Sequence, residues 1–223
     1  MTSPPPNRRR PLVVLALTIL ALPSWFFISG RSQTRPSKTT QELKALIDAD
    51  QSEPLPPGLP SDPAEQERVF RAYWDEHFKP RRDRAVELIE AGRLATAEDY
   101  ELAGTLLNHS AYPEDQLIAH VLFTAAVHKG RATARWYSAT ALDNYLVAIG
   151  RPQAFGTLWG APGRPDKDRS GVMGQPMTDA LRREFCVPSL PRQLVLLDHL
   201  RRGDVATWRG GKIDCEGEGR PLP

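Results

Sequence analysis

The chain has 223 residues, of which 25% are charged, and its formal net charge is only +2. This length accommodates one domain with or without tails. Five arginines and no acidic residue lie within residues 1–35, so the rest of the chain carries a net charge of −3. A mildly acidic domain of this kind is poorly suited to binding phosphate groups, and we therefore expect no nucleic-acid partner.

The N-terminus predicts contact with a membrane. Residues 1–10 are polar and end in three arginines, and residues 11–30 carry no charge over 20 positions. A helix of that length rises about 30 Å, enough to cross a bilayer core. The bulky run Trp25-Phe26-Phe27 suits a membrane interface better than a cleavage site. We expect a single-pass anchor in the cell membrane with the C-terminal domain outside the cytoplasm; the alternative is a cleaved signal and a secreted or periplasmic protein.

A Pro-rich tether is predicted for residues 31–62, interrupted by a short amphipathic piece from Thr40 to Asp48. The helical core domain is expected at 63–157. Its first helix begins at Ser61-Asp62-Pro63, where a capping side chain precedes a proline, and Pro80 ends or kinks it. Apolar residues follow helical spacing in this segment: Val69, Phe70, Tyr73, Trp74, His77 and Phe78. A second helix, 81–91, precedes Gly92, which fits a C-terminal cap.

Three further helices are expected between residues 96 and 157. Thr96 and Asp99 fit a capping box, with Asp in place of the usual Glu or Gln. Pro113 opens the next helix, which Gly130 closes, and Gly150 closes a third helix from about 131 to 149. The residues expected to face the core from the middle helix are Leu117, Ile118, Val121, Leu122 and Ala125. Those expected from the third helix are Ala134, Tyr137, Ala141, Leu142, Tyr145 and Ile149, with Trp136 and Val147 on a second side.

The remainder consists of a polar loop at 158–177 and C-terminal helices with a tail at 178–223. Cys186 and Cys215 are the two cysteines, and in an exported domain such a pair predicts a disulfide. Two buried thiols that never meet remain the alternative. The fold class that follows is mainly α: a compact helical-hairpin bundle, repeat-like in its small-residue helices, after one N-terminal transmembrane or signal segment.

The polar residues that could carry chemistry lie in the central stretch. His109, His120 and Asp143 are candidate acid–base residues, because a carboxylate on a partly apolar helix face needs a partner or shifts its pKa. Arg151 is a second possible partner for Asp143. A structural polar network that fixes helix register is the other interpretation. No histidine pair has the close spacing of known zinc motifs, and no phosphate-binding or nucleophile motif is present, so we predict no metal and no cofactor.

A longer pattern resembles a family of uncharacterised bacterial proteins with a histidine after the first helix, a later Asp-Arg pair and a Gly-x-x-Gln-x-aromatic-Gly-Thr-Gln ending. Residues 96–157 carry it: Ala97-Glu98-Asp99-Tyr100, His109, Pro113-Glu114-Asp115, Ala119-His120, Gly130, Ala134-Arg135-Trp136, Leu142-Asp143, Tyr145-Leu146, Gly150, Gln153, Phe155, Gly156 and Thr157. Asn144 replaces the family's Arg, and Leu158 replaces its last Gln. The segment 125–150 also resembles one unit of the Sel1-type helical repeats.

The family resemblance implies a bacterial source and a compact helical domain, and it marks candidate site positions. These are His109, His120, Asp143, Gln153 and Thr157; Arg151, Phe155 and Gly156 complete the candidate binding set. We expect a binding or scaffolding module of the cell envelope with a protein partner rather than an enzyme. Two alternatives remain open: an acid–base hydrolase that uses His109 or His120 with Asp143 under a 158–177 lid, and a purely structural envelope protein.

Overall fold

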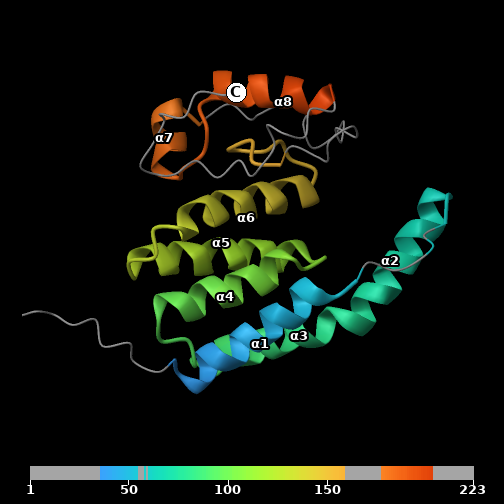
Figure 1. The fold of residues 1–223 in the computed structure, drawn as a ribbon, viewed down its shortest axis with the longest axis vertical. Helices are drawn as coiled ribbons and strands as arrows, with labels where there is room; N and C mark the ends of the chain where they lie inside the picture. Colours follow the sequence, from blue (N-terminus) through green and yellow to red (C-terminus); the bar gives the residue numbers. More distant parts are fainter. Residues whose placement is uncertain (1–35, 55–57, 59, 159–176, 203–223) are drawn as a thin grey trace, which may run out of the picture. The chain divides into compact units, whose positions relative to one another are not determined.

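A computed structural model of the chain describes residues 36–54, 58, 60–158 and 177–202. Within these ranges the chain is mainly helical and contains no strand, which confirms the expected α class. The helices, labelled in Figure 1, are α1 (Lys38–Ser52), α2 (Pro63–His77), α3 (Lys79–Glu90), α4 (Ala97–Asn108), α5 (Pro113–His128), α6 (Ala134–Ala148), α7 (Asp179–Glu184) and α8 (Leu190–Arg201).

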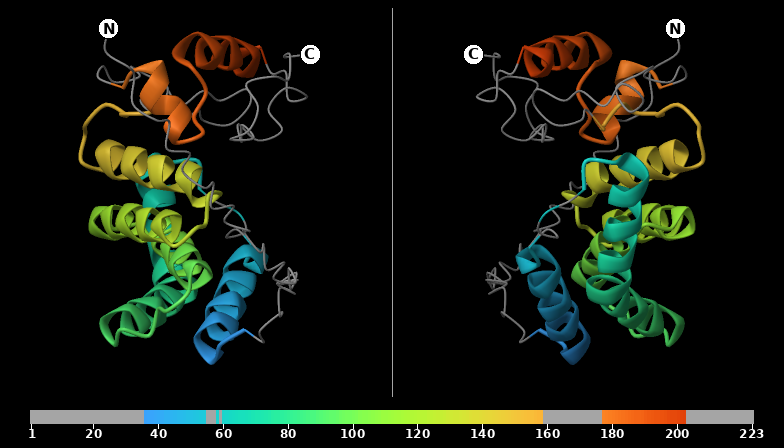
Figure 2. Two further views of the ribbon diagram at one scale, coloured as in Figure 1. Left: turned by 90° about the vertical axis from the view of Figure 1, so that its left-hand side faces the viewer. Right: turned by 90° about the vertical axis from the view of Figure 1, so that its right-hand side faces the viewer.

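The core is built around α5, which packs along both α4 and α6 (Figures 1 and 2). Phe123 of α5 is completely buried and stacks on Tyr137 of α6, with ring centroids 5.5 Å apart. Alanines occupy much of the remaining contact: Ala103, Ala119, Ala126, Ala134 and Ala141 are all fully buried. Small side chains let neighbouring helix axes approach closely, so large residues are needed at few positions of this core.

Helix ends follow the local sequence signals. The Thr96 hydroxyl accepts from the Asp99 amide at 3.1 Å, and the Asp99 carboxylate accepts from the Thr96 amide at 2.8 Å, which confirms the capping box. Pro113 occupies the first position of α5. Gly130 and Gly150 adopt φ of 97° and 73° just after α5 and α6, a conformation in which a side chain is strained.

The face of α5 that was expected to be buried is instead exposed. Leu117, Ile118 and Val121 are 39%, 42% and 59% exposed, and only Leu122 of that group is buried while Ala125 is intermediate. The residues that face α4 and α6 include Ala119, Phe123 and Ala126. Because α5 is apolar nearly all round, its periodicity does not distinguish the two faces. The buried face is the one on which alanines allow close contact with α4 and α6.

The expectation for α6 is confirmed at Ala134 and Ala141, which are fully buried. It is wrong at Ile149, which lies just after the helix and is 45% exposed. Trp136 is intermediate and packs against a second, smaller cluster that contains Phe155 and Val187. The helix therefore contacts the main core along one side and this second cluster along another.

The range 31–62, assigned to a tether from its composition, contains the ordered helix α1. This helix is longer than the predicted piece Thr40–Asp48 and packs against α3 and α4. Leu43 is completely buried, and the Thr40 hydroxyl donates to Asp99 of α4 at 2.6 Å. Burial raises the pKa of Asp99, but the hydrogen bonds from Thr40 and from the Thr96 and Ala95 amides outweigh it, so its pKa lies below the ordinary value.

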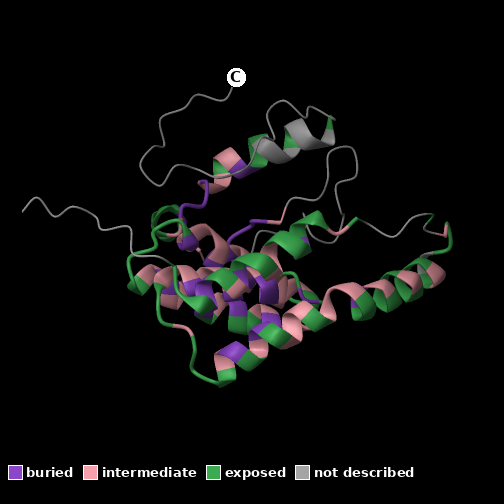
Figure 3. Cartoon of the chain, turned by 60° about the horizontal axis from the view of Figure 1, so that its bottom comes forward, coloured by how far each residue is buried: buried purple, intermediate pink, exposed green. Residues whose placement is uncertain are grey.

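The helix is interrupted at Phe78, which ends α2 and precedes α3. This interruption lies two residues before Pro80, as the proline predicts. Trp74 is buried and meets Tyr112 edge-on at 5.3 Å, whereas Phe70 is 43% exposed. Figure 3 shows most of α2 as exposed or intermediate. Only the C-terminal part of α2 therefore joins the core.

Gly104→Ala is expected to destabilise the protein by about 1 kcal/mol. Alanine in a helix gains about 1 kcal/mol over glycine, but its Cβ would lie 3.1 Å from two ring carbons of Phe123. That ring is fully buried and stacked on Tyr137, so it cannot move away freely, and overpacking costs about 1–3 kcal/mol. Urea unfolding measures the change. In a Phe123→Leu background the alanine should cost less; an equal cost there would contradict the steric explanation.

Several predictions concern segments outside the described residues: the anchor or signal at 11–30, most of the 158–177 loop, and the tail with Cys215. In the ranges that are described, no helix is both long and apolar enough to cross a bilayer. Cys186 is buried directly after α7 with φ of 58°. Its disulfide with Cys215 stays a prediction.

Candidate functional site

His109 caps the C-terminus of α4 and contacts α1 rather than Asp143. Its Nδ1 lies 2.6 Å from Oδ2 of Asp50, whose side chain is only 5% exposed. The imidazole is 39% exposed. This pair ties the end of α1 to the end of α4, which gives His109 a structural role in the observed arrangement.

His120 contacts α6 through the backbone of Ser138. Its Nδ1 lies 2.9 Å from the Ser138 carbonyl and 3.0 Å from the Ser138 hydroxyl. Because a carbonyl only accepts, Nδ1 carries the proton and donates it. The Thr124 hydroxyl donates to the His120 carbonyl and lies 3.0 Å from the same serine hydroxyl. The group fixes α5 against α6, as the register-setting interpretation predicts.

Asp143 is fully buried on α6 and accepts four hydrogen bonds from one short loop. Oδ1 accepts from the amides of Ala154 and Phe155 at 2.7 and 2.9 Å. Oδ2 accepts from the amide and the hydroxyl of Thr157, both at 2.8 Å. Burial raises the pKa of Asp143, and these four donors counteract part of that rise. The carboxylate thus organises the loop, and no candidate histidine is hydrogen-bonded to it.

The candidate binding residues around Asp143 form this loop, which we call the 153–158 loop. The Gln153 amide closes it: its Nε2 donates to the Leu158 carbonyl at 3.0 Å, and its Oε1 accepts from the Leu158 amide at 2.9 Å. Gly156 adopts φ of 80°, a turn conformation that glycine permits. Arg151 is exposed just before the loop, and its backbone amide donates to Leu146. The structure thus places Gln153, Gly156 and Thr157 in the loop that is bonded to Asp143. Their contacts shape this loop.

Phe155 links the loop to the C-terminal helices. It is 2% exposed and its ring lies 4.8 Å from that of Phe185. Its carbonyl accepts from Nε2 of Gln193 at 2.9 Å and from Nε of Arg182 at 3.3 Å. Because Phe155 is enclosed by these contacts, it stabilises the attachment of α7 and α8 and is not exposed for ligand binding.

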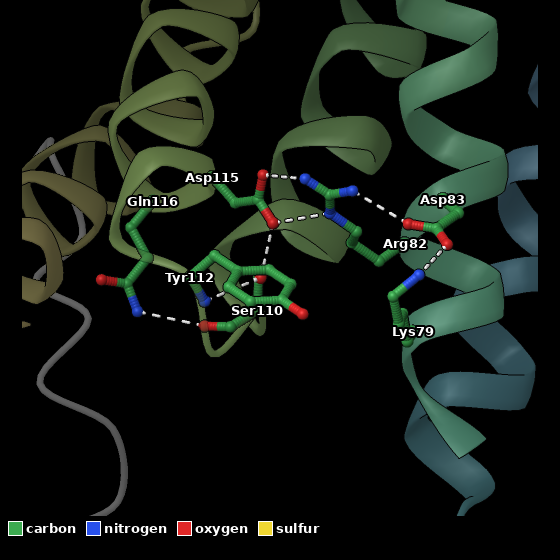
Figure 4. Close-up of polar contacts among 7 residues, drawn as sticks. All are labelled: Lys79, Arg82, Asp83, Ser110, Tyr112, Asp115 and Gln116. Atoms are coloured by element: carbon green, nitrogen blue, oxygen red, sulfur yellow. Dashed lines mark hydrogen bonds and ion pairs between the residues drawn. The ribbon is translucent and has the colours of Figure 1, made fainter. Parts of the chain in front are cut away.

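A charged cluster that the sequence had not indicated lies between α3 and α5 (Figure 4). Arg82 of α3 donates to both carboxylate oxygens of Asp115 of α5, at 2.7 and 2.6 Å. The Asp115 side chain is 1% exposed, and the Ser110 hydroxyl donates to it at 2.5 Å. Asp115 lies in the first turn of α5, where a carboxylate interacts favourably with the helix dipole. Its partner Arg82 is 33 residues away, so no local sequence pattern indicates the pair.

The chemistry of this cluster is that of a structural ion pair. Lys79 and Arg82 both contact Asp83 and lower its pKa, and the hydrogen bonds to Asp115 raise the pKa of Arg82 above its ordinary value. Both oxygens of the Asp115 carboxylate accept from Arg82, and one of them also accepts from the Ser110 hydroxyl. These three side chains satisfy one another as a structural network. The described residues also contain no group of three or more His, Cys, Asp and Glu that could hold a metal ion.

The described part of the chain also has an exposed apolar surface on α5. We call Leu117, Ile118 and Val121 the α5 apolar face; all three side chains are more than one-third exposed. Exposed Glu114 precedes this face on the helix, and exposed His128 follows it. Contiguous apolar residues with a polar border are typical of protein-binding surfaces. The sequence had placed these residues correctly on one face and wrongly in the core.

Comparison with known proteins does not assign the chain to a family. No protein-family model matches the chain, and no curated protein or solved structure is significantly similar to it. The resemblance of residues 96–157 to a bacterial family remains a prediction.

Proposed function

We propose that this chain is a helical protein-binding module of the cell envelope that docks its partner on the α5 apolar face. The observation that carries the proposal is the exposure of Leu117, Ile118 and Val121 on the helix at the centre of the core. Desolvating three large aliphatic side chains is favourable by roughly 25 cal/mol for each Å² buried. The uncharged segment 11–30 supports placement at the membrane, with the helical domain outside the cytoplasm.

The acid–base hydrolase is less well supported. His109 pairs with Asp50, His120 with Ser138, and Asp143 with the 153–158 loop. These contacts engage each candidate group separately, whereas acid–base catalysis needs the groups to converge on one substrate. A binding module needs no such convergence, only an accessible surface on a rigid support.

The test is affinity capture of the full-length chain from detergent-solubilised envelopes. Val121→Glu puts a charge at the most exposed position of the α5 apolar face, and it should reduce captured partner roughly tenfold or more. Val195→Glu on α8 is the matched control, because Val195 is also exposed, at 44%. Circular dichroism establishes that both variants remain folded. Equal capture by wild type, Val121→Glu and Val195→Glu would reject the α5 apolar face as the binding surface.

A further inference from the structure

We propose that Arg81 binds an oxyanion, a carboxylate or a phosphate, through the edge of its guanidinium that carries Nε and Nη2. Both nitrogens are buried, and neither has a hydrogen-bond partner among the residues that the structure describes. Arg81 lies in the first turn of α3, directly after the end of α2. The site uses none of the residues of the α5 apolar face, so it goes beyond the proposed function and is tested independently of it.

Arg82, the next residue, shows what this edge of a guanidinium binds. Its Nε and Nη2 donate to the two carboxylate oxygens of Asp115 at 2.7 and 2.6 Å (Figure 4). Two parallel N–H groups match the spacing of two oxygens on one carboxylate or phosphate. From the side chain of Arg81, the described part of the chain contains one hydrogen bond, in which Nη1 donates to Oε2 of Glu53 at 3.2 Å. The edge that is satisfied by Asp115 in Arg82 therefore still needs an acceptor in Arg81.

Glu53 does not supply that acceptor, because three side chains share its carboxylate. Its Oε1 accepts from the Tyr73 hydroxyl at 2.9 Å and lies 3.1 Å from Nδ1 of His77. Its Oε2 is the oxygen that faces Arg81, and it contacts Nη1 on the other side of the guanidinium. A buried donor without an acceptor is costly, more so when it belongs to a charged group. These contacts indicate that an acceptor comes from a bound ligand.

The guanidinium of Arg81 is held in position by contacts that leave this edge available. Its central carbon lies 4.9 Å from the centre of the Phe78 ring, and Glu53 holds Nη1. A donor pair fixed in this way loses little conformational freedom when a ligand binds. The Arg81 side chain is 14% exposed and that of Glu53 is 17% exposed. The group therefore lies close to the molecular surface, where a small solute needs only a local rearrangement to reach it.

A third buried donor at the end of α2 supports the same ligand chemistry. Nε1 of Trp74 is buried and has no partner among the described residues. Trp74 lies in the last turn of α2, and its carbonyl accepts from the amide of Phe78, whose ring contacts Arg81. The indole and the guanidinium are both donors only. A ligand that suits this part of the molecule must therefore present acceptors, as an oxyanion does.

An anion titration of the full-length protein in uncharged detergent tests the site. Sodium phosphate and sodium acetate are added separately at neutral pH, with the ionic strength held constant by sodium chloride. Nitrogen-edited proton NMR spectra follow the Nε–H resonance of Arg81 in the wild type, so this readout needs no variant. We expect that resonance to shift and to saturate with a dissociation constant of about 1–10 mM, which is typical of a small ligand held by few contacts.

Two lysine substitutions on α3 locate the binding. Arg81→Lys keeps the positive charge but removes the paired N–H groups, and it should raise the dissociation constant about tenfold. Arg84→Lys is the matched control, because Arg84 is 46% exposed and pairs with Glu42 and Glu87 at the surface. This control should bind as the wild type does. The rise of the unfolding temperature with anion concentration gives the constant for each variant, and circular dichroism establishes that each is folded.

The outcomes identify the ligand or overturn the proposal. Saturation with phosphate alone assigns the site to phosphate groups, and saturation with acetate assigns it to carboxylates. If neither anion saturates the Arg81 resonance at about 100 mM, the proposal is wrong. Equal dissociation constants for wild type and Arg81→Lys would also overturn it. Because Val121 takes no part in this site, each of these results leaves the capture experiment with Val121→Glu unaffected.

Discussion

Asp143→Ala is expected to lower the free energy of unfolding by about 3–5 kcal/mol, because it leaves buried donors without an acceptor. Three backbone amides and the Thr157 hydroxyl would lose their bonds to the carboxylate. Urea unfolding followed by circular dichroism gives the free energy. Asp48→Ala is the control, since Asp48 is exposed on α1 and its removal should change stability little.

The loss should be concentrated near the C-terminal helices. The 153–158 loop holds α7 and α8 through the Phe155 carbonyl, which accepts from Arg182 and Gln193. Hydrogen exchange in Asp143→Ala should therefore accelerate at 154–157 and along α7, while α4 and α5 keep their protection. Unchanged exchange at 154–157 would contradict the organising role of Asp143.

Asp143→Asn gives a pH-dependent form of the same test. Burial raises the pKa of Asp143 above its ordinary value of about 3.9. The carboxyl therefore contributes most stability below that ordinary value, and the contribution is lost as pH rises through the raised pKa of the folded state. Asparagine does not titrate, so the difference in unfolding free energy between wild type and Asp143→Asn should narrow as the pH rises above about 4. A constant difference would mean that the pKa of Asp143 is the same in the folded and unfolded states.

Arg82→Met is expected to destabilise the protein by about 3–5 kcal/mol, because it leaves the Asp115 carboxylate buried without its cation. Asp115 is 1% exposed and would retain the hydroxyl of Ser110 as its side-chain donor. Arg84→Met on the same helix is the matched control. Arg84 is about half exposed and bonds to Glu42 and Glu87 at the surface, so its loss should matter little.

A double variant separates the ion pair from the packing. Arg82→Met/Asp115→Leu removes both charges and leaves no buried ion, so it should recover at least about 2 kcal/mol relative to the sum of the single changes. Arg82 also lies over the Tyr112 ring at 5.5 Å, and methionine retains part of that apolar contact. Purely additive single changes, measured by urea unfolding, would show that Arg82 and Asp115 are not energetically coupled.

The sequence located helix boundaries well, because the signals for them act within one helical turn. Asp62, Thr96 and Thr178 each cap the helix that follows, and Pro113 starts α5. A capping hydroxyl, a proline ring or a glycine at positive φ acts on its immediate backbone neighbours, whatever the rest of the fold does. The same locality explains why α1 was underestimated. Its sequence is mostly polar, so the amphipathic pattern from Thr40 to Asp48 covers only part of the helix. Contacts with α4, such as the hydrogen bond from Thr40 to Asp99, support the whole helix.

The sequence by itself therefore determined an α-helical chain, where most of its helices begin and end, and which polar residues needed partners. Tertiary structure decided what those partners are: the 153–158 loop for Asp143, Asp50 for His109 and Ser138 for His120. It also paired Asp115 with Arg82, which the sequence had not indicated. It also decided that Leu117, Ile118 and Val121 face outward. The reason is physical. Helix signals depend on residues adjacent in the chain, whereas the buried face of a helix that is apolar all round, and the donor that satisfies a buried carboxylate, depend on segments far away in the sequence.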